Sequence, residues 1–426
     1  IRYHPRLSEV KRKALTYFHA SPSRPNDLRY QRALTRASQD FRLVSKVNPL
    51  HINDSIKQFQ HPDRSPGLPY TLEGFKRKDE VPPDRIKQYV HNLKYGVYDR
   101  CNTPCTAAVK TMVAADPKFR LIWVYPAHMT FAEGMFANPL INAYTAHRGK
   151  YGLWINYAKG DMRLLMSQRQ PHNLWLGADW EGYDASVPAW LIRDAFNILR
   201  SNLDFSRYQD WGVPTDPDTL PRLWDRIVKY FIDTPLRFQD GIVWKKHRGV
   251  PSGSFFTSLV DSVCNAIVWH YLLGDDIACA RWFVGDDALV EIKRDVDLDH
   301  LASSARTSFG MSLSVTKTET GTHVPFLGYT MGTTGIPLAR YDKLLAQLLL
   351  PARPDRFFTE FCSRAKALQL SCFGLGCWNF TILVQQFLDE HAVDFQPSLY
   401  SRDELMTKLH ALDLAHWPPL SSVMKR

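Results

Sequence analysis

An acidic turn between two short apolar runs is the feature that most constrains how this chain can fold. The runs Trp282-Phe283-Val284 and Ala288-Leu289-Val290 flank the tripeptide Gly285-Asp286-Asp287. Short apolar runs rich in aromatic and branched residues, joined by a turn of Gly and Asp, are typical of a β-hairpin. The pattern therefore predicts a hairpin with neighbouring carboxylates at its tip. An ordinary acidic turn without a chemical role is the alternative, because Asp is a common turn residue.

The same tripeptide also occurs at Gly274-Asp275-Asp276, so its presence alone decides nothing. Gly274 follows a long apolar segment, which we predict to be a helix that ends near Leu273. A glycine in this position is suited to end a helix. We therefore expect Asp275 and Asp276 to lie in a solvated loop, and residues 285–287 to be the copy with a chemical role.

A further carboxylate, Asp179, follows the apolar run Leu174-Trp175-Leu176, which predicts a strand. Magnesium prefers oxygen ligands, and a two-metal phosphoryl-transfer site needs carboxylates that converge from separate segments. Asp179, Asp286 and Asp287 are therefore candidate ligands for two Mg²⁺ ions. Asp184 lies five positions after Asp179, which is weak evidence when taken alone.

A stripe of polar residues follows the small, flexible segment Ser252-Gly253-Ser254. Thr257, Asp261 and Asn265 recur every four residues and so share one face of the predicted helix. The rest of that helix is apolar, and polar groups on a buried helix must find polar partners. A nucleotide ribose would supply them. Hydrogen bonds to neighbouring backbone are an equally good interpretation for any one of the three.

The charge of the chain favours a polyanionic partner. The formal net charge is +10 and the pI is near 9.2. Residues 1–64 contain 13 Lys or Arg residues and 5 Asp or Glu residues, a net charge of +8. Clustered basic residues attract phosphate backbones, so this region could line a nucleic-acid path. A solvated basic surface without a ligand is the rival interpretation.

Other classes of protein are disfavoured by the sequence. The seven cysteines are scattered without the paired Cys or His spacing of a zinc site, which favours a reduced intracellular setting. No stretch of about 18 apolar residues is present, so we expect a soluble protein without a membrane partner. The sequence contains no Gly-x-x-x-x-Gly-Lys-Ser/Thr loop, which argues against an NTP-driven helicase. The sequence begins at Ile1 rather than Met, which leaves open that its original beginning is missing.

The order of segments predicts a mixed α and β protein of two or three subdomains. Seven prolines between residues 62 and 117 predict an irregular first third. A helix is predicted from Val187 and a second hairpin around Val324 to Met331. The final 80 or so residues have Leu-rich and aromatic segments that predict mostly helices.

Several motifs, taken in order along residues 64 to 335, carry a resemblance to a known family. They are Ser65-Pro66-Gly67-Leu68-Pro69-Tyr70, Lys118-Phe119-Arg120-Leu121-Ile122, Asp179 with Asp184, Ser252-Gly253 with Thr257, Gly285-Asp286-Asp287, Lys317, and Phe326-Leu327-Gly328-Tyr329. This set resembles the RNA-dependent RNA polymerases of RNA viruses, most closely those of double-stranded RNA viruses of the partitivirus and picobirnavirus kind. An ordered set of motifs is far more specific than any single one.

The resemblance implies an α+β fold shaped as a right hand, with fingers, a palm built on an antiparallel sheet, and a thumb, closed by contacts between fingers and thumb. The implied divisions are an N-terminal region with fingers (1–172), a first palm part (173–200), a fingers insertion (201–248), a second palm part (249–335) and a mostly helical thumb (336–426).

The resemblance also implies an enzyme that copies viral RNA from NTPs, and a role for each motif. Asp179, Asp286 and Asp287 would hold two Mg²⁺ ions, with Mn²⁺ as a substitute, and Lys317 would be a general acid. The ribose would be recognised by Asp184, Ser252, Gly253, Thr257 and either Asp261 or Asn265, and the triphosphate by Lys110, Lys118 and Arg120. Ser65, Pro66 and Gly67 would form the template entrance, and Phe326, Leu327 and Gly328 would support the primer strand. The family often has Asn where this chain has Asp261, which leaves open whether Asp261 or Asn265 reaches the ribose.

The implied partners are template and product RNA, NTPs and the capsid protein of a virus particle. The implied location is the virion interior and the host cytoplasm. Two rivals remain open from the sequence: a palm polymerase of the reverse transcriptase kind, and a non-catalytic RNA-binding or capsid-associated protein.

Overall fold

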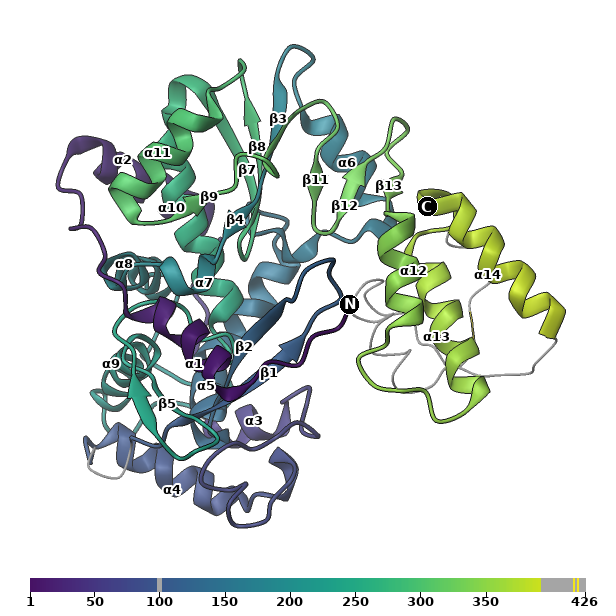
Figure 1. Cartoon of the computed structure of the whole chain (residues 1–426). Helices are drawn as coiled ribbons and strands as arrows, with labels where there is room; N and C mark the ends of the chain where they lie inside the picture. The colour runs from purple at the N-terminus through teal and green to yellow at the C-terminus, as the bar shows by residue number, and fades with distance from the viewer. Residues whose placement is uncertain (98–101, 392–416, 418–419, 421–426) are drawn as a thin grey trace.

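The computed structural model describes residues 1–97, 102–391, 417 and 420 (Figure 1). One four-stranded sheet, here called the central sheet, consists of β10 (Glu319–Gly321), β3 (Leu174–Ala178), β8 (Asp287–Ile292) and β7 (Ala278–Val284), in that order. All neighbouring strands in this sheet run antiparallel. The predicted hairpin around residues 285–287 is confirmed as the β7–β8 pair.

Three further sheets are present among the described residues. The first has the order β2 (Phe119–Val124), β1 (Cys105–Thr111), β5 (Pro235–Arg237) and β6 (Val243–Lys245). The second contains β11 (Pro325–Phe326), β12 (Tyr329–Met331) and β13 (Pro337–Leu338), and the third pairs β4 (Trp180–Glu181) with β9 (Ser312–Leu313). The β11–β12 pair confirms the second predicted hairpin. The mixture of helices with antiparallel sheets is the expected α+β class.

The long apolar helix predicted to end near Leu273 is α10 (Thr257–Ile277). Gly274 interrupts it with a φ of 65°, where a residue with a side chain would be strained, so the main helix ends where the sequence indicated. Asp275 and Asp276 are exposed, as predicted, but they lie in one more helical turn rather than in a loop. Asp275 forms an ion pair with Arg36 at 2.8 Å.

The prediction of an irregular first third is wrong. This part contains α1 (Leu7–Leu15), α2 (Leu28–Asp40), α3 (Ile52–Lys57), α4 (Pro83–Lys94) and α5 (Ala127–Ala146). One of these prolines begins a helix instead of breaking one, since Pro83 is the first residue of α4. Pro126 likewise stands directly before α5. Helix α5 is buried on nearly all sides, so its sequence lacks the helical periodicity of a surface helix.

The other helices complete the layers around the sheets. They are α6 (Asp161–Gln168), α7 (Tyr183–Ser186), α8 (Ala189–Arg200), α9 (Thr219–Ile232) and α11 (Leu298–Phe309), with short 3₁₀ helices at Thr16–Phe18, Lys78–Glu80, Gly152–Trp154, Tyr157–Lys159 and Leu375–Cys377. The helix predicted from Val187 begins as α8 two residues later, after Pro188.

Helices α12 (Tyr341–Leu349), α13 (Phe358–Ser371) and α14 (Trp378–His391) form a separate group beside the sheets, next to which the N-terminus lies (Figure 1). They share their own small core, which includes Leu344, Leu368 and Phe380. The helical character predicted for this part is confirmed as far as residue 391. Residues 392–416, 418–419 and 421–426 of the predicted thumb lie outside the described residues. The predicted subdomain boundaries stay predictions.

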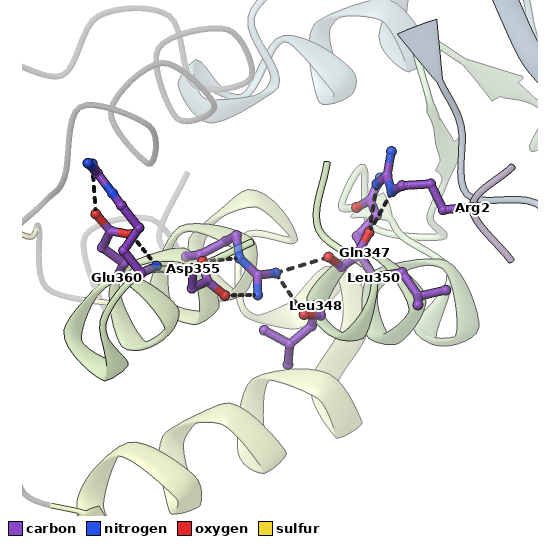
Figure 2. Close-up of polar contacts among 8 residues, drawn as sticks. Arg2, Gln347, Leu348, Leu350, Asp355 and Glu360 are labelled. Carbon is purple, nitrogen blue, oxygen red and sulfur yellow. Dashed lines mark hydrogen bonds and ion pairs between the residues drawn. The ribbon is translucent and has the colours of Figure 1, made fainter. Parts of the chain in front are cut away.

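The N-terminal segment joins this helical group to the rest of the chain (Figure 2). The Arg2 guanidinium donates to the carbonyl oxygen of Leu350 at 2.6 and 3.2 Å, and to Thr111 of β1 at 2.9 and 3.1 Å. A cation at this end of α12 is also favoured by the helix dipole. The contact closes the structure between β1 and α12, in the manner expected of a closed hand.

Within the described ranges, no single helix is long and apolar enough to cross a membrane. The segments Phe358–Ser371 and Leu375–His391, bent by 97°, meet the length and composition requirement only as a pair.

Candidate active site

Two chain segments bring carboxylates together at one end of the central sheet. Gly285 has a φ of 60° and is the first residue of the two-residue turn between Val284 and Asp287, a position where hairpins favour glycine. Asp286 is the second residue of that turn. Asp179 directly follows β3, whose last residue, Ala178, pairs with Ala288. The predicted convergence of Asp179 with Asp286 and Asp287 is therefore present in the fold.

Two side chains of helix α10 hold the turn in place by hydrogen bonds. The Ser262 hydroxyl accepts a hydrogen bond from the Gly285 amide at 2.7 Å, and Asn265 Nδ2 donates to the Gly285 carbonyl at 3.1 Å. Asn265 Oδ1 also accepts from the indole of Trp180, the residue after Asp179, at 3.1 Å. The fully buried Asn265 thus links the two carboxylate segments. Its amide is engaged beneath the site.

Burial and the nearby negative charges raise the pKa values of Asp286 and Asp287. Loss of hydration, followed by the charges of Asp286 and Asp179, raises the pKa of Asp287 to about 7. The same loss of hydration, with a smaller effect of Asp179, raises the pKa of Asp286, although Asp286 is exposed at the turn. The positive charge of Arg120 opposes both shifts. A cation placed among these carboxylates would be favoured.

Asp184 and Asp261 extend the acidic cluster. Burial and the charge of Asp286 raise the pKa of Asp184 to about 6. Burial, then the charges of Asp184 and Asp286, raise the pKa of Asp261 well above its usual value. Asp261 is 4% exposed, and its Oδ1 is a buried atom without a hydrogen-bond donor among the described residues. An oxygen in that state is suited to meet a polar ligand.

The carboxylate oxygens at this site fit a divalent cation that is bound jointly by the protein and the substrate. Among residues 1–97, 102–391, 417 and 420, no three His, Cys, Asp or Glu side chains form a ready-made metal cage. Mg²⁺ usually takes one or two protein carboxylates and completes its shell with water and substrate phosphates. Asp179, Asp286 and Asp287 provide oxygen donors of that kind from two segments.

The three basic residues predicted to bind triphosphate lie on one hairpin. Lys110 and Arg120 are paired across β1 and β2, and Lys118 lies just before β2. All three side chains are exposed. Arg120 faces the acidic cluster, since its charge lowers the pKa of Asp184 as well as those of Asp286 and Asp287. An anionic ligand between Arg120 and the cluster would meet a cation on this side.

The segment around Ser252 is in direct contact with the backbone of β2. The Ser252 hydroxyl donates to the Leu121 carbonyl at 3.0 Å. A Cβ on Gly253 would come within 1.6 Å of the Trp123 carbonyl oxygen, so only glycine fits there. The Thr257 hydroxyl lies near the carbonyl oxygens of Pro251 at 3.0 Å and of Ser254, and so bonds within its own segment. This confirms the interpretation in which Thr257 bonds to neighbouring backbone.

The predicted general acid, Lys317, is exposed and lies in the turn between β9 and β10. The next residue, Thr318, accepts a hydrogen bond from the Asp179 amide at 3.2 Å, and Ser314 donates its amide to the Asp179 carbonyl at 2.8 Å. The lysine is therefore carried by a turn that is bonded directly to the Asp179 backbone.

The predicted template entrance packs against the start of α5. The Pro66 carbonyl accepts from the Ala127 amide at 2.8 Å, and the Ser65 carbonyl accepts from the Lys78 ammonium at 2.5 Å. Gly67 has a φ of 65°, and a Cβ there would lie 2.5 Å from the Tyr125 carbonyl oxygen. Ser65 is exposed, whereas Pro66 and Gly67 are buried.

The predicted primer support forms the β11–β12 turn. Leu327 and Gly328 have φ values of 51° and 81°, as a type I′ turn requires, and Phe326 is buried. Leu327 and Gly328 line a cavity of about 330 Å³ together with Val284 and Lys343. Lys343 was missed by sequence reasoning, although its charge lowers the pKa of Asp287. A larger cavity, of about 830 Å³, lies elsewhere, between α2 and α8.

Sequence reasoning also missed Glu133, a buried acid in the middle of α5. Its carboxylate accepts hydrogen bonds from the Ser254 hydroxyl and, at 3.4 Å, from the Phe255 amide. Burial raises the pKa of Glu133 to about 8 in spite of these bonds. The signal that could have found it is a lone acid within an otherwise uncharged and mostly apolar segment, Met129 to Leu140.

Glu133 is expected to make the stability of the protein depend on pH. The neutral carboxyl tolerates burial, so its contribution to folding is fully present below about pH 4.5 and is lost as the pH rises through about 8. A pKa unit corresponds to about 1.4 kcal/mol, which limits the slope to about 1.4 kcal/mol per pH unit. Thermal unfolding between about pH 5 and about pH 8 should show a shallower decline for Glu133→Gln than for the native chain. Equal slopes would contradict this assignment.

Comparisons with known proteins agree with this geometry. The profile of the family described as viral RNA-dependent RNA polymerase matches residues 2–351. The chain is 28% identical over 284 residues to the RNA-directed RNA polymerase of Cryptosporidium parvum virus 1, which covers 59% of this chain and 51% of that protein. It is 26% identical over 262 residues to the RNA-directed RNA polymerase of White clover cryptic virus 1, which covers 52% of this chain and 41% of that protein. The chain thus spans about half the length of these relatives or less.

Solved structures share the fold. The RNA-dependent RNA polymerase of a human picobirnavirus has a TM-score of 0.69 at 14% identity, and the comparison covers 95% of this chain and 75% of that one. The Sicinivirus 3Dpol polymerase has a TM-score of 0.72 at 16% identity, covering 96% and 91%. The architecture is therefore that of a right-hand polymerase, as predicted. The chain belongs to the viral RNA-dependent RNA polymerase family, whose members depend on divalent metal ions and use RNA and NTPs.

Proposed function

We propose that this protein is an RNA-directed RNA polymerase that copies viral RNA in transcription and replication, adding nucleotides from NTPs to a growing RNA 3′-hydroxyl. One observation carries the proposal: Asp179, Asp286 and Asp287 meet at one end of the central sheet, opposite Arg120, in a chain of this family. Carboxylates that can hold metal ions, with a basic residue near them to bind phosphate, are suited to nucleotidyl transfer.

Two Mg²⁺ ions, with Mn²⁺ as a substitute, would be held by Asp179, Asp286 and Asp287 and would supply the Lewis-acid chemistry at the α-phosphate. Arg120, supported by Lys110 and Lys118, would bind the triphosphate and neutralise part of its charge. Lys317 would donate a proton to the leaving pyrophosphate. The Ser262 and Asn265 side chains would keep Asp286 and Asp287 aligned through Gly285.

Recognition of the sugar would rest on Asp184, Asp261, Ser252 and Gly253. Burial and the neighbouring carboxylates raise the pKa of Asp261, which favours its protonated form, and in that form the carboxyl can donate as well as accept, as the amide of Asn does. Asp261 is therefore the member of the stripe that we assign to the ribose, while Asn265 bonds to Trp180 and Gly285.

The RNA would enter past Ser65, Pro66 and Gly67. The product strand would be supported by Phe326, Leu327 and Gly328, with Lys343 across the cavity that Leu327 and Gly328 line. We further propose that the enzyme works in the virion interior and in the host cytoplasm, together with the capsid protein. The support for these locations is the similarity to polymerases of double-stranded RNA viruses. Copurification of the chain with intact particles would test them.

The proposed activity is tested by offering the chain a primed RNA template, Mg²⁺ and either NTPs or dNTPs. We expect incorporation of NTPs to exceed that of dNTPs by about 10²-fold or more, because a site that hydrogen-bonds a hydroxyl rejects an analogue that lacks it. A preference for dNTPs would instead identify a reverse transcriptase. Salt-dependent RNA binding without nucleotide addition would identify a non-catalytic RNA-binding protein.

A further inference from the structure

The segment that carries Ser252 and Gly253, here called the 249–255 loop, is held at its first end by a buried lysine. The Lys246 ammonium donates to the Gly249 carbonyl at 2.9 Å and to the carbonyls of Phe231 and Ile232 at the end of α9. The Val250 amide donates to the Asp184 carbonyl at 2.7 Å. The first end of the loop is thereby joined both to α9 and to the acidic cluster.

Glu133 holds the opposite end. Its carboxylate bonds to the Ser254 hydroxyl and lies 3.4 Å from the Phe255 amide, and the Ser254 hydroxyl also accepts the Phe256 amide at 3.0 Å. Glu133 is 1% exposed and lies on α5, outside the acidic cluster. Burying a carboxyl is costly, whereas an apolar side chain of similar size would pack there at no such cost. The role of this acid therefore lies in the hydrogen bonds that it makes to Ser254 and Phe255.

We propose that Glu133 is a positioning residue that sets the conformation of the 249–255 loop and, through Ser252 and Gly253, the preference for ribose over deoxyribose. This inference rests on the function proposed above. Lys246 holds the first end, so displacement of Ser252 depends on the end that Glu133 holds. The loop is in close contact with β2, because Ser252 bonds to Leu121 and Gly253 lies against Trp123. A small shift of Ser254 would therefore move Ser252 and Gly253 relative to Arg120, which lies on β2 next to Leu121.

The geometry predicts which substitutions should be tolerated. Burial keeps Glu133 largely neutral near neutral pH, and in that form one oxygen accepts from the Phe255 amide while the carboxyl hydroxyl donates to the Ser254 oxygen, so the contact with Ser254 is kept with its direction reversed. Gln offers the same pair of groups in nearly the same shape, so Glu133→Gln should support the loop. Glu133→Ala removes the hydrogen bonds to Ser254 and Phe255. Ser254→Ala removes the hydroxyl group to which Glu133 is bonded.

The experiment measures kcat and KM for ATP and for dATP on one primed RNA template, with the full chain and its variants. We expect Glu133→Ala and Ser254→Ala each to lower the ratio of kcat/KM for ATP to that for dATP by about tenfold, the value of one net hydrogen bond. The double variant should lose no more than either single variant, because both remove the same contact. Glu133→Gln should stay within about twofold of the native ratio.

Glu291→Gln is the matched control. Glu291 is also fully buried and accepts from a backbone amide, that of Gln170 at 2.9 Å, and from a side chain, that of Asn173 at 2.7 Å, but it lies at the far end of β8. It should affect thermal stability and leave the ATP to dATP ratio unchanged.

Three results would overturn the inference. They are an unchanged ratio in the folded Ala variants, additive losses in the double variant, or a loss in Glu133→Gln equal to that in Glu133→Ala. If Glu133→Ala does not fold, Ser254→Ala and Glu133→Gln decide the matter. A native chain that adds no ATP at all overturns the proposed function, and this inference with it, whereas normal native synthesis with unchanged ratios overturns the inference alone.

Discussion

Asp286→Asn is expected to lower nucleotide addition by at least about 10²- to 10³-fold while the chain stays folded. Asp286 is the outermost carboxylate of the β7–β8 turn, and its charge raises the pKa values of Asp287 and Asp184. An amide keeps the shape of the turn but removes the negative charge that a metal ion requires. Primer extension with Mg²⁺, together with thermal unfolding, measures both parts of this expectation.

The chain contains its own control for this substitution. Asp276→Asn changes the second aspartate of the other Gly-Asp-Asp, which is exposed on the last turn of α10. It should leave nucleotide addition at the native level. Equal activity of Asp286→Asn and the native chain would refute the assignment of the metal site, and a comparable loss in Asp276→Asn would show that the two copies had been assigned wrongly.

Gly253→Ala is the second substitution with a large expected effect. The added Cβ would lie 1.6 Å from the Trp123 carbonyl oxygen and 2.8 Å from its carbon, both of them backbone atoms that cannot rotate away. Either β2 or the 249–255 loop must move, and overpacking of this kind costs about 1 to 3 kcal/mol or more. A displacement of about 1 Å in a catalytic site costs about 10²-fold in rate. We therefore expect kcat/KM for NTPs to fall by about that factor, with a lower melting temperature.

Gly149→Ala is a matched control, because the atoms within 3 Å of its added Cβ belong to the His147 side chain, which can rotate. It should change stability and kcat/KM little. A Gly253→Ala variant with native kinetics would show that the close approach to β2 does not position the site.

Local patterns were enough to locate the carboxylates. The hairpin at residues 278–292 follows from two apolar runs and a turn of Gly and Asp, and the strand before Asp179 follows from another apolar run. Both predictions depend on residues that are close together in the sequence. The family resemblance carried by the ordered motifs then implied the right-hand fold, which the similar structures confirm.

Other features could not be read in this way. Helix α5 was missed because burial on nearly every side removes the periodicity on which helix prediction depends. The two candidates Asp261 and Asn265 share one face of α10, and the sequence treats them alike. Tertiary contacts separate them, since Asn265 bonds to Trp180 and Gly285.

The sequence by itself determined the hairpin, its acidic turn and the identity of the carboxylates that make the candidate site. Only the tertiary structure decided how that site is supported: Arg120 opposite the cluster, Lys343 beside Asp287, and Glu133 beneath Ser254. Glu133 and Ser254 are 121 positions apart. The physical reason is the same in each case. A turn or strand is favoured by interactions within a few residues, whereas each of these contacts joins segments that are distant in the sequence and meet only in the folded chain.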